Sequence, residues 1–196
     1  MSPGEALALP NLPAAAPPGS VVTAGRLEAL VAHHSAFVWR SLLRLGVPRA
    51  DAEDAVQQVF LVAARRLADI EVGRETAFLF STAMRIAARA RRTQQRRREV
   101  LEEEHAERID PAPDPEALVD HACARAKLDA ILDTMQLDLR AVFVLFEIEQ
   151  MTVPEIAAML DLPVGTVASR LRRAREHFQA AVKRIEARRT LRGSQA

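Results

Sequence analysis

The residues best suited to specific chemistry lie in the segment 151–178, MTVPEIAAMLDLPVGTVASRLRRAREHF. If its second half is a helix, one face carries small polar and basic side chains, namely Thr166, Ser169, Arg172 and Arg173. Hydroxyl groups bond several base edges, and the guanidinium group bonds guanine especially well. Arg170 and Arg175 flank this face, where they would bind phosphates and so position the helix. The pattern predicts a helix that reads the major groove of DNA.

Two short helices separated by a break would position this face. Thr152 and Glu155 form a T-x-x-E capping box, in which each side chain satisfies a backbone N–H at the start of the first helix. The residues DLP at 161–163 end that helix, and a second one is expected to begin near Val164. The buried face of the second helix would carry Val167, Leu171, Ala174 and Phe178. The alternative is a helical hairpin with solvated arginines, but the combined features favour DNA binding.

A second basic surface is expected on a helix that spans about residues 77–98. Its cations recur at i, i+4, i+7 and i+11 and therefore share one outer stripe, made of Arg85, Arg89, Arg92 and Arg96. No acidic residue occurs in this range, so repulsion among the charges costs stability unless a ligand neutralises them. Phosphate binding explains the stripe better than solvation does, and it predicts a steep dependence of binding on salt. Charge alone leaves RNA open as the ligand.

An earlier helix, expected from Asp51 to about Ala68, carries a stripe of mixed character. Its exposed side would present Asp51, Asp54, Gln57, Gln58 and Leu61. The helix dipole favours acids in the first turn and explains Asp51 without any function. It does not explain two glutamines and an exposed leucine along the same stripe, a mixture typical of a surface for a partner helix. Catalytic carboxylates are a poor interpretation, because no nucleophile, histidine or metal set accompanies them.

The remaining residues argue against an enzyme, a metalloprotein and a membrane protein. His33 and His34 have no matching set of Cys and His ligands nearby, and no phosphate-cradling glycine loop or nucleophile–base set is found. We therefore expect no catalysis, no metal and no cofactor. The single cysteine allows no internal disulfide, which fits a reducing cytoplasm. No apolar run approaches the ~20 residues that span a bilayer, so the chain is expected to be soluble and cytoplasmic.

Charge and proline divide the 196-residue chain into segments. We expect a disordered proline-rich tail at 1–24, a helical domain at 25–98, an acidic linker at 99–117, a second helical domain at 118–187 and a frayed tail at 188–196. Abundant alanine and the lack of alternating β-branched runs predict helices and no sheet. The predicted fold is all-α, with two small helical domains joined by a flexible acidic linker and a helix-turn-helix in the second domain.

Two segments resemble a known family. PVGTVASRLRRARE, from Pro163, is similar to the promoter-reading helix of bacterial sigma factors of the extracytoplasmic-function group. DAEDAVQQVF, from Asp51, is similar to the sigma-factor segment that binds the clamp coiled coil of the RNA polymerase β′ subunit. The resemblance covers about residues 27–98 and 121–185. It implies a detachable subunit that directs the polymerase core, through its β′ and β subunits, to promoter DNA and initiates transcription.

The resemblance also implies a role for each surface. The mixed stripe of residues 51–61 would bind core polymerase, with Phe60 packed inside the domain. The arginine stripe would recognise and open the −10 element, the preceding loop at about 70–76 would capture an unstacked base, and the helix-turn-helix would read the −35 element. The acidic linker would thread through the RNA-exit path. An anti-sigma protein is implied as the inhibitor.

The chain departs from the family pattern at a few positions. Ala168 occupies a place where the family usually has Lys or Arg, so one polar contact to the −35 element is missing. Phe78 replaces the usual Trp, and Met84, Arg85 and Arg89 occur where Arg, Asn and Asp are common.

Three other interpretations remain open. A stand-alone dimeric helix-turn-helix regulator would need a dimer surface and palindromic sites, and it would leave the mixed stripe unused. An RNA-binding helical protein, such as an anti-terminator, would act without polymerase. An enzyme is the weakest alternative, for want of a catalytic set of residues.

Overall fold

The computed structural model describes residues 18–104 and 118–193, and every regular element in these ranges is helical. The first range contains α1 (Pro18–Leu45), α2 (Ala52–Arg65) and α3 (Glu75–Glu104), with short 3-10 turns at Arg49–Asp51 and Leu67–Asp69. The second contains α4 (Leu118–Asp133), α5 (Leu137–Phe143), a π-helical turn (Val144–Ile148), α6 (Val153–Leu160) and α7 (Val164–Gly193). The predicted all-α fold with a helix-turn-helix is confirmed.

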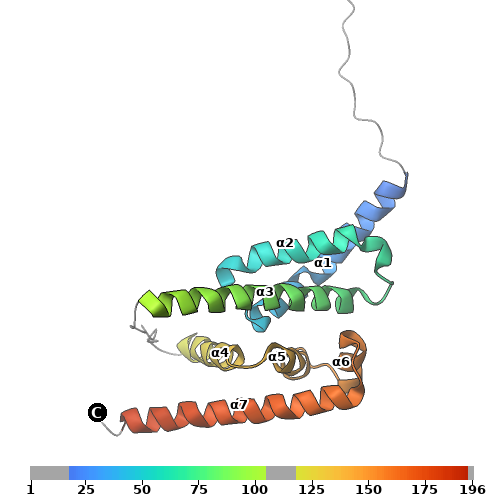
Figure 1. Ribbon diagram of the computed structural model, residues 1–196. Coiled ribbons are helices and arrows are strands. Elements are labelled where there is room, and N and C mark those ends of the chain that lie inside the picture. Colours follow the sequence, from blue (N-terminus) through green and yellow to red (C-terminus); the bar gives the residue numbers. More distant parts are fainter. Residues whose placement is uncertain (1–17, 105–117, 194–196) are drawn as a thin grey trace, which may run out of the picture.

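The helices form two groups that lie against each other (Figure 1). Helices α1, α2 and α3 pack on one another and are called the N-module here. The C-module consists of α4 to α7, and its shorter helices lie between α3 and the long helix α7 (Figure 1). The two long helices, α3 and α7, therefore run along opposite sides of the layer that α4, α5 and α6 form.

Apolar residues at helical spacing build the core of the N-module. Each helix contributes fully buried side chains, among them Val38, Leu42 and Leu45 from α1, Val59 and Ala63 from α2, and Leu79, Ala83 and Ala87 from α3. Phe60 is 9 % exposed and packs in this core, which confirms its predicted inward position.

Helix α1 ends in a glycine turn. Gly46 has φ +98°, a left-handed conformation that glycine adopts without a steric penalty. The N–H of Gly46 donates to the carbonyl of Leu43 (3.1 Å), and the N–H of Val47 donates to that of Leu42 (3.0 Å). These two bonds form a Schellman motif, which satisfies the last carbonyls of the helix.

Three helices extend beyond their predicted limits. Helix α1 begins at Pro18, so residues 18–24 are helical although composition predicts a tail there; proline is well tolerated in a first helical turn. Helix α3 continues to Glu104, six residues into the predicted linker at 99–117, because Glu and Leu are good helix formers and the prolines come later. Helix α7 reaches Gly193, into the predicted frayed tail. Residues 1–17, 105–117 and 194–196 lie outside the described ranges.

One apolar cluster runs through both modules. It joins N-module residues such as Leu42 and Phe80 to C-module residues such as Val142, Leu145 and Ile156. A smaller cluster inside the C-module contains Leu132, Met135, Phe143 and Ala174. The two modules thus pack against each other, because each leaves an apolar face that the other covers.

Candidate nucleic-acid and protein interfaces

The predicted capping box begins the helix-turn-helix. The Thr152 N–H donates to the Glu155 carboxylate (2.7 Å), and the Glu155 N–H donates to the Thr152 hydroxyl oxygen (3.5 Å). The Thr152 hydroxyl also donates to this carboxylate (2.7 Å). Hydrogen bonds from the Thr152 side chain and backbone lower the pKa of Glu155 below its ordinary value. The entry to α6 is therefore fixed by local bonds.

The turn between α6 and α7 depends on a residue with positive φ. Asp161 has φ +53°, a conformation that Asp tolerates better than most residues do. The Leu162 N–H donates to the carbonyl of Ala157 (3.0 Å), which closes α6. The carbonyl of Pro163 then accepts from the N–H groups of Thr166 (2.9 Å) and Val167 (3.1 Å), which starts α7.

The two faces of α7 agree with the predicted pattern. Val167, Leu171 and Ala174 are buried, and Phe178 is partly buried against Phe143. On the other face Ser169, Arg172 and Arg173 are exposed, and Thr166 is half-buried. The Ser169 hydroxyl donates to the carbonyl of Thr166 (2.9 Å), and Arg172 pairs with Glu176 one turn later (2.7 Å). These groups must exchange partners to contact DNA.

The two flanking arginines are held by acids of the same module. Arg170 forms an ion pair with Asp138 of α5 (3.0 Å). Arg175 forms one with Glu147 (2.7 Å) and also lies over the ring of Phe146, with 4.8 Å between its Cζ and the ring centroid. Each guanidinium is therefore positioned at the edge of the exposed face of α7. A phosphate at either position would compete with a carboxylate.

Val164 is a candidate contact that the sequence pattern did not single out. It lies three residues before Val167 and so shares the apolar spacing, yet its side chain is 52 % exposed. The first turn of α7 leaves it uncovered at the tip of this helix. An exposed apolar group there can contact the methyl group of thymine.

The arginine stripe on α3 is exposed along its length. Arg85, Arg89, Arg92 and Arg96 all belong to this exposed face. Arg85 lies at one cleft, beside the loop at 70–76, whereas Arg89 lines a different groove between α2 and α3. The stripe thus connects the loop end of α3 with the side where α2 lies.

The mixed stripe on α2 adjoins this second groove. Asp51, Asp54, Gln57 and Gln58 are exposed, and Leu61 is 55 % exposed despite its apolar side chain. The groove has a volume of about 560 Å³, and Asp51, Asp54 and Gln58 line it together with Arg89. The structure therefore brings three residues of the predicted protein-binding surface next to one of the predicted DNA-binding surface.

The loop before α3 is anchored by a residue that the sequence did not single out. Arg26 of α1 donates to the carbonyls of Leu67 (3.1 Å) and Ile70 and lies 3.9 Å from the Glu75 carboxylate. Gly73 has φ +87°, and its N–H donates to Glu75 (2.7 Å). No periodic pattern marks Arg26, since its partners are backbone carbonyls more than 40 positions away. Within the loop Ile70 is buried while Val72 is exposed.

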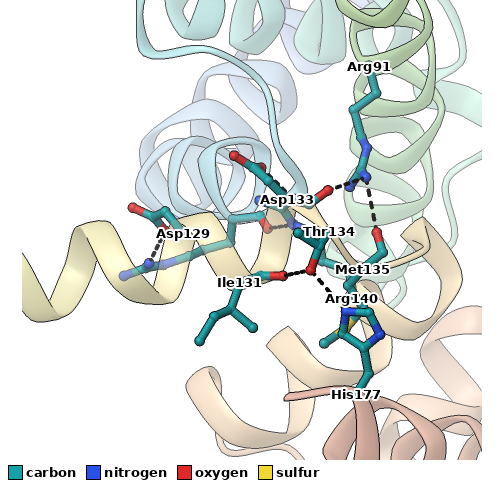
Figure 2. Close-up of polar contacts among 9 residues, drawn as sticks. Arg91, Asp129, Ile131, Asp133, Thr134, Met135, Arg140 and His177 are labelled. Carbon is teal, nitrogen blue, oxygen red and sulfur yellow. Dashed lines mark hydrogen bonds and ion pairs between the residues drawn. The ribbon is translucent and has the colours of Figure 1, made fainter. Parts of the chain in front are cut away.

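Arg91 behaves differently from the other arginines of α3. It is half-buried and off the i, i+4, i+7 spacing of the stripe, and its Nη2 donates to the carbonyls of Asp133 (3.1 Å) and Met135 (3.0 Å) in the C-module (Figure 2). Its role is therefore contact between modules.

The part of the chain that the structure describes has neither a metal-binding cluster nor a membrane-spanning helix. Residues 18–104 and 118–193 contain no cluster of three His, Cys, Asp or Glu side chains that could hold a metal ion. Within the same ranges, no helix has both the length and the apolar content to cross a bilayer.

Comparison with known proteins matches both modules to one group. The family described as sigma-70 region 2 matches residues 30–97, and sigma-70 region 4 matches residues 125–178. The chain is 31 % identical over 153 residues to the ECF RNA polymerase sigma factor SigE of Mycolicibacterium smegmatis, a match that covers 78 % of this chain and 60 % of that protein. It is 32 % identical over 154 residues to the ECF RNA polymerase sigma-E factor of Escherichia coli K12, covering 73 % and 80 %.

Two solved structures have a similar fold. CnrH, in complex with the cytosolic domain of CnrY, has a TM-score of 0.60 at 25 % identity, with 84 % of this chain and 94 % of that chain covered. The sigma factor RpoE of Bartonella quintana, in complex with the anti-sigma factor NepR, has a TM-score of 0.57 at 21 % identity, with 81 % and 97 % covered. Region 2 and region 4 match in that order along the chain, and the alignment at 32 % identity covers 80 % of the E. coli protein. These findings show that this chain belongs to the ECF RNA polymerase sigma factors.

Proposed function

We propose that this chain directs bacterial RNA polymerase core to specific promoters and initiates transcription there. One observation carries the proposal. The chain contains, in the order that the family has them, the exposed mixed stripe of α2, the exposed arginine stripe of α3 and a capped helix-turn-helix. The chain itself catalyses nothing in this proposal, since nucleotide addition belongs to the polymerase. It acts where the polymerase acts, in the bacterial cytoplasm.

The N-module would supply the polymerase contact and the −10 contact. A stripe with acids at one end and exposed Leu61 at the other offers charge and apolar area to a helical partner such as the β′ clamp. Arg85, Arg89, Arg92 and Arg96 would bind backbone phosphates of the −10 DNA. The loop at 70–76 would take the unstacked base, whose removal from the stack costs a few kcal/mol that its contacts must offset.

The C-module would read the −35 element. Ser169, Arg172 and Arg173 project from α7 and supply donors for base edges. Arg170 and Arg175 would hold the phosphates at either side once they leave Asp138 and Glu147. The β subunit would receive this module on the polymerase.

An anti-sigma protein is the regulator that we propose for this chain. The similar sigma factor RpoE of B. quintana forms a complex with such a protein, the anti-sigma factor NepR. A protein that covers the docking stripe of residues 51–61 would prevent association with core polymerase.

Transcription with purified core polymerase tests the proposal. The full chain is mixed with core and with a library of promoter fragments, and the RNA products are sequenced. We expect transcripts that start at a common distance from a shared two-part motif and that disappear when the chain is omitted. Specific DNA binding as a dimer, without any effect of polymerase, would instead identify a stand-alone regulator.

A further inference from the structure

Two consecutive residues of the π-helical turn contact the same arginine of α7. The carboxylate of Glu147 accepts a hydrogen bond from the Nε of Arg175 (2.7 Å), and the ring of Phe146 lies 4.8 Å from the Cζ of that arginine. A cation this close to an aromatic ring is attracted to the ring face. The guanidinium of Arg175 is therefore held by an anion and by a ring, both from the turn that follows α5.

The backbone of this turn is unusual. The N–H of Glu149 donates to the carbonyl of Val144, five residues earlier (3.0 Å), which widens the helix by one residue. Gln150 then has φ +56°, and its side-chain amide donates to the carbonyl of Glu147 (2.7 Å). Single π turns and residues with positive φ are both concentrated at functional sites. In this chain the wide turn presents Phe146 and Glu147 to one guanidinium.

The two contacts use different parts of the guanidinium. Its five N–H groups lie in one plane, so the carboxylate binds at the edge while the ring covers a face. A DNA phosphate also binds at the edge. The ring of Phe146 can therefore stay in place when a phosphate arrives. The carboxylate of Glu147 cannot do so without placing two anions side by side, where they repel each other.

Partial exposure makes this arrangement accessible to DNA. The side chain of Arg175 is 47 % exposed, so a phosphate can reach it from solvent. The side chain of Glu147 is 34 % exposed, so water and salt screen its charge only in part. Its repulsion of an incoming phosphate is therefore felt at the edge of the exposed face of α7.

We propose that Phe146 and Glu147 have opposite effects on the binding of phosphate by Arg175, an inference that rests on the proposed DNA binding by α7. Phe146 is a positioning residue that keeps the guanidinium at the edge of the exposed face. Glu147 is an internal competitor that occupies the guanidinium until a phosphate replaces it. The carboxylate thereby lowers the affinity of the C-module for DNA of every sequence.

The same competition does not apply to the arginine stripe of α3. No carboxylate among the described residues forms an ion pair with Arg85, Arg89, Arg92 or Arg96. Phosphate contacts supply essentially all of the affinity of a protein for non-specific DNA. The C-module therefore gains less than the N-module from phosphates alone, and contacts with base edges decide where α7 binds.

Replacing the competitor without changing its shape gives the first test. In the whole chain, Glu147→Gln removes the charge and leaves a side chain of the same length. We expect this variant to bind a labelled DNA duplex of mixed sequence about threefold more tightly than the parent does. The slope of log affinity against log salt should become steeper by up to about one. Fluorescence anisotropy measures both, with core polymerase present and with core absent.

Replacing the ring should have the opposite effect. Phe146→Leu keeps an apolar side chain but removes the aromatic face, so we expect about threefold weaker binding with an unchanged salt slope. Phe146→Tyr restores a ring and should bind as the parent does. Thermal unfolding of both variants is measured in parallel. A residue that only fills the core would lower the melting temperature without this pattern of affinities.

Two controls separate competition from a general effect of charge. In an Arg175→Ala background, neither Glu147→Gln nor Phe146→Leu should change the affinity, because the guanidinium that both contact is absent. Asp161→Asn removes the same charge from an exposed residue of the helix-turn-helix that forms no ion pair with any described residue. Asn also tolerates the positive φ of this position. We expect this control to change the affinity less than about twofold.

The outcomes distinguish this inference from the proposed function. Glu147→Gln that binds no more tightly than the parent, or that gains equally without Arg175, would overturn the competition. Phe146→Leu that binds as tightly as the parent would overturn the positioning role. Either result can occur while the chain still supports transcription with core. Opposite effects of the two variants would support the inference even if core polymerase ignored the chain, a finding that would overturn the proposed function instead.

Discussion

Individual arginines on the outer face of α7 decide whether the chain reads bases or only holds phosphates. If Arg172 or Arg173 bonds a guanine, its replacement by Ala should weaken −35 binding by about 1–3 kcal/mol and relax the preference at one base pair. Affinities for duplexes that differ at single positions measure this. A loss of equal size on every duplex would identify a phosphate contact.

Arg170→Ala is the internal comparison for that experiment. Because Arg170 lies at the edge of the face and is paired with Asp138, we expect its removal to weaken binding equally on all sequences. The salt dependence of binding should also become shallower. A sequence-dependent loss for Arg170→Ala would mean that the reading face is wider than proposed.

The capping box of α6 makes a stability prediction that depends on pH. The pKa of Glu155 lies below its ordinary value of 4.5 in the folded chain, because the charged carboxylate accepts bonds from Thr152. This stabilisation is complete above the unfolded-state pKa and is lost as the pH falls through the lower folded-state value. The difference in free energy of unfolding between the parent and Glu155→Ala, measured in urea, should therefore shrink below about pH 4.5. A difference that stays constant from pH 7 to pH 3 would contradict this.

At the scale of elements, the glycine that ends α1 is both a helix terminator and part of the module boundary. Gly46→Ala places a Cβ at φ +98° and 3.0 Å from Arg140, so we expect a loss of at least about 1–2 kcal/mol in the free energy of unfolding. Gly25→Ala in the same helix meets nothing within 4 Å and should stabilise the chain by about 0.5–1 kcal/mol. Urea denaturation of both variants measures the contrast, and equal effects would contradict it.

The types and faces of the helices follow from the sequence, whereas their ends follow less well. Charged and polar spacing predicts the exposed stripes of α2 and α3, and apolar spacing predicts the buried face of α7. The capping box and the DLP break locate α6 and its turn. Composition misplaces the start of α1 and the end of α3, because helix formers continue past the point where charge or proline content changes. Periodicity is strong in the middle of a helix and weak in its terminal turns.

At the scale of the whole molecule, the sequence predicts two modules but not how they meet. Val142, Leu145 and Ile156 have the apolar character of any core residue, and nothing local indicates that the N-module covers them. In the sequence, Arg91 looks like one more arginine of a DNA-binding helix, and Arg140 looks like an ordinary surface charge. In the structure, both side chains bind backbone carbonyls across the module boundary. Contacts between residues far apart in the chain are set by shape and by desolvation, which the local pattern does not contain.

Exposure supports predicted interfaces on both modules. The stripe on α2 is exposed, including Leu61, and the polar and basic face proposed to read DNA on α7 also points outward. The proposed −10 contacts follow from the exposure and positive charge of α3, where Phe78, Arg85 and Arg89 differ from the usual family residues. Direct crosslinking of these positions to −10 DNA is the experiment that locates them.

The central claim is that the chain docks on RNA polymerase core through the stripe of α2. The most direct measurement is the dissociation constant of the complex with core polymerase, determined for three versions of the whole chain. These are the parent, the double variant Asp54→Ala/Gln58→Ala, and the control Glu28→Ala, which changes an exposed residue of α1. We predict tight binding of the parent and of the control, and at least a tenfold weaker affinity, about 1.4 kcal/mol, for the double variant. A parent chain that does not bind core, or a double variant that binds as tightly as the parent, would contradict the claim.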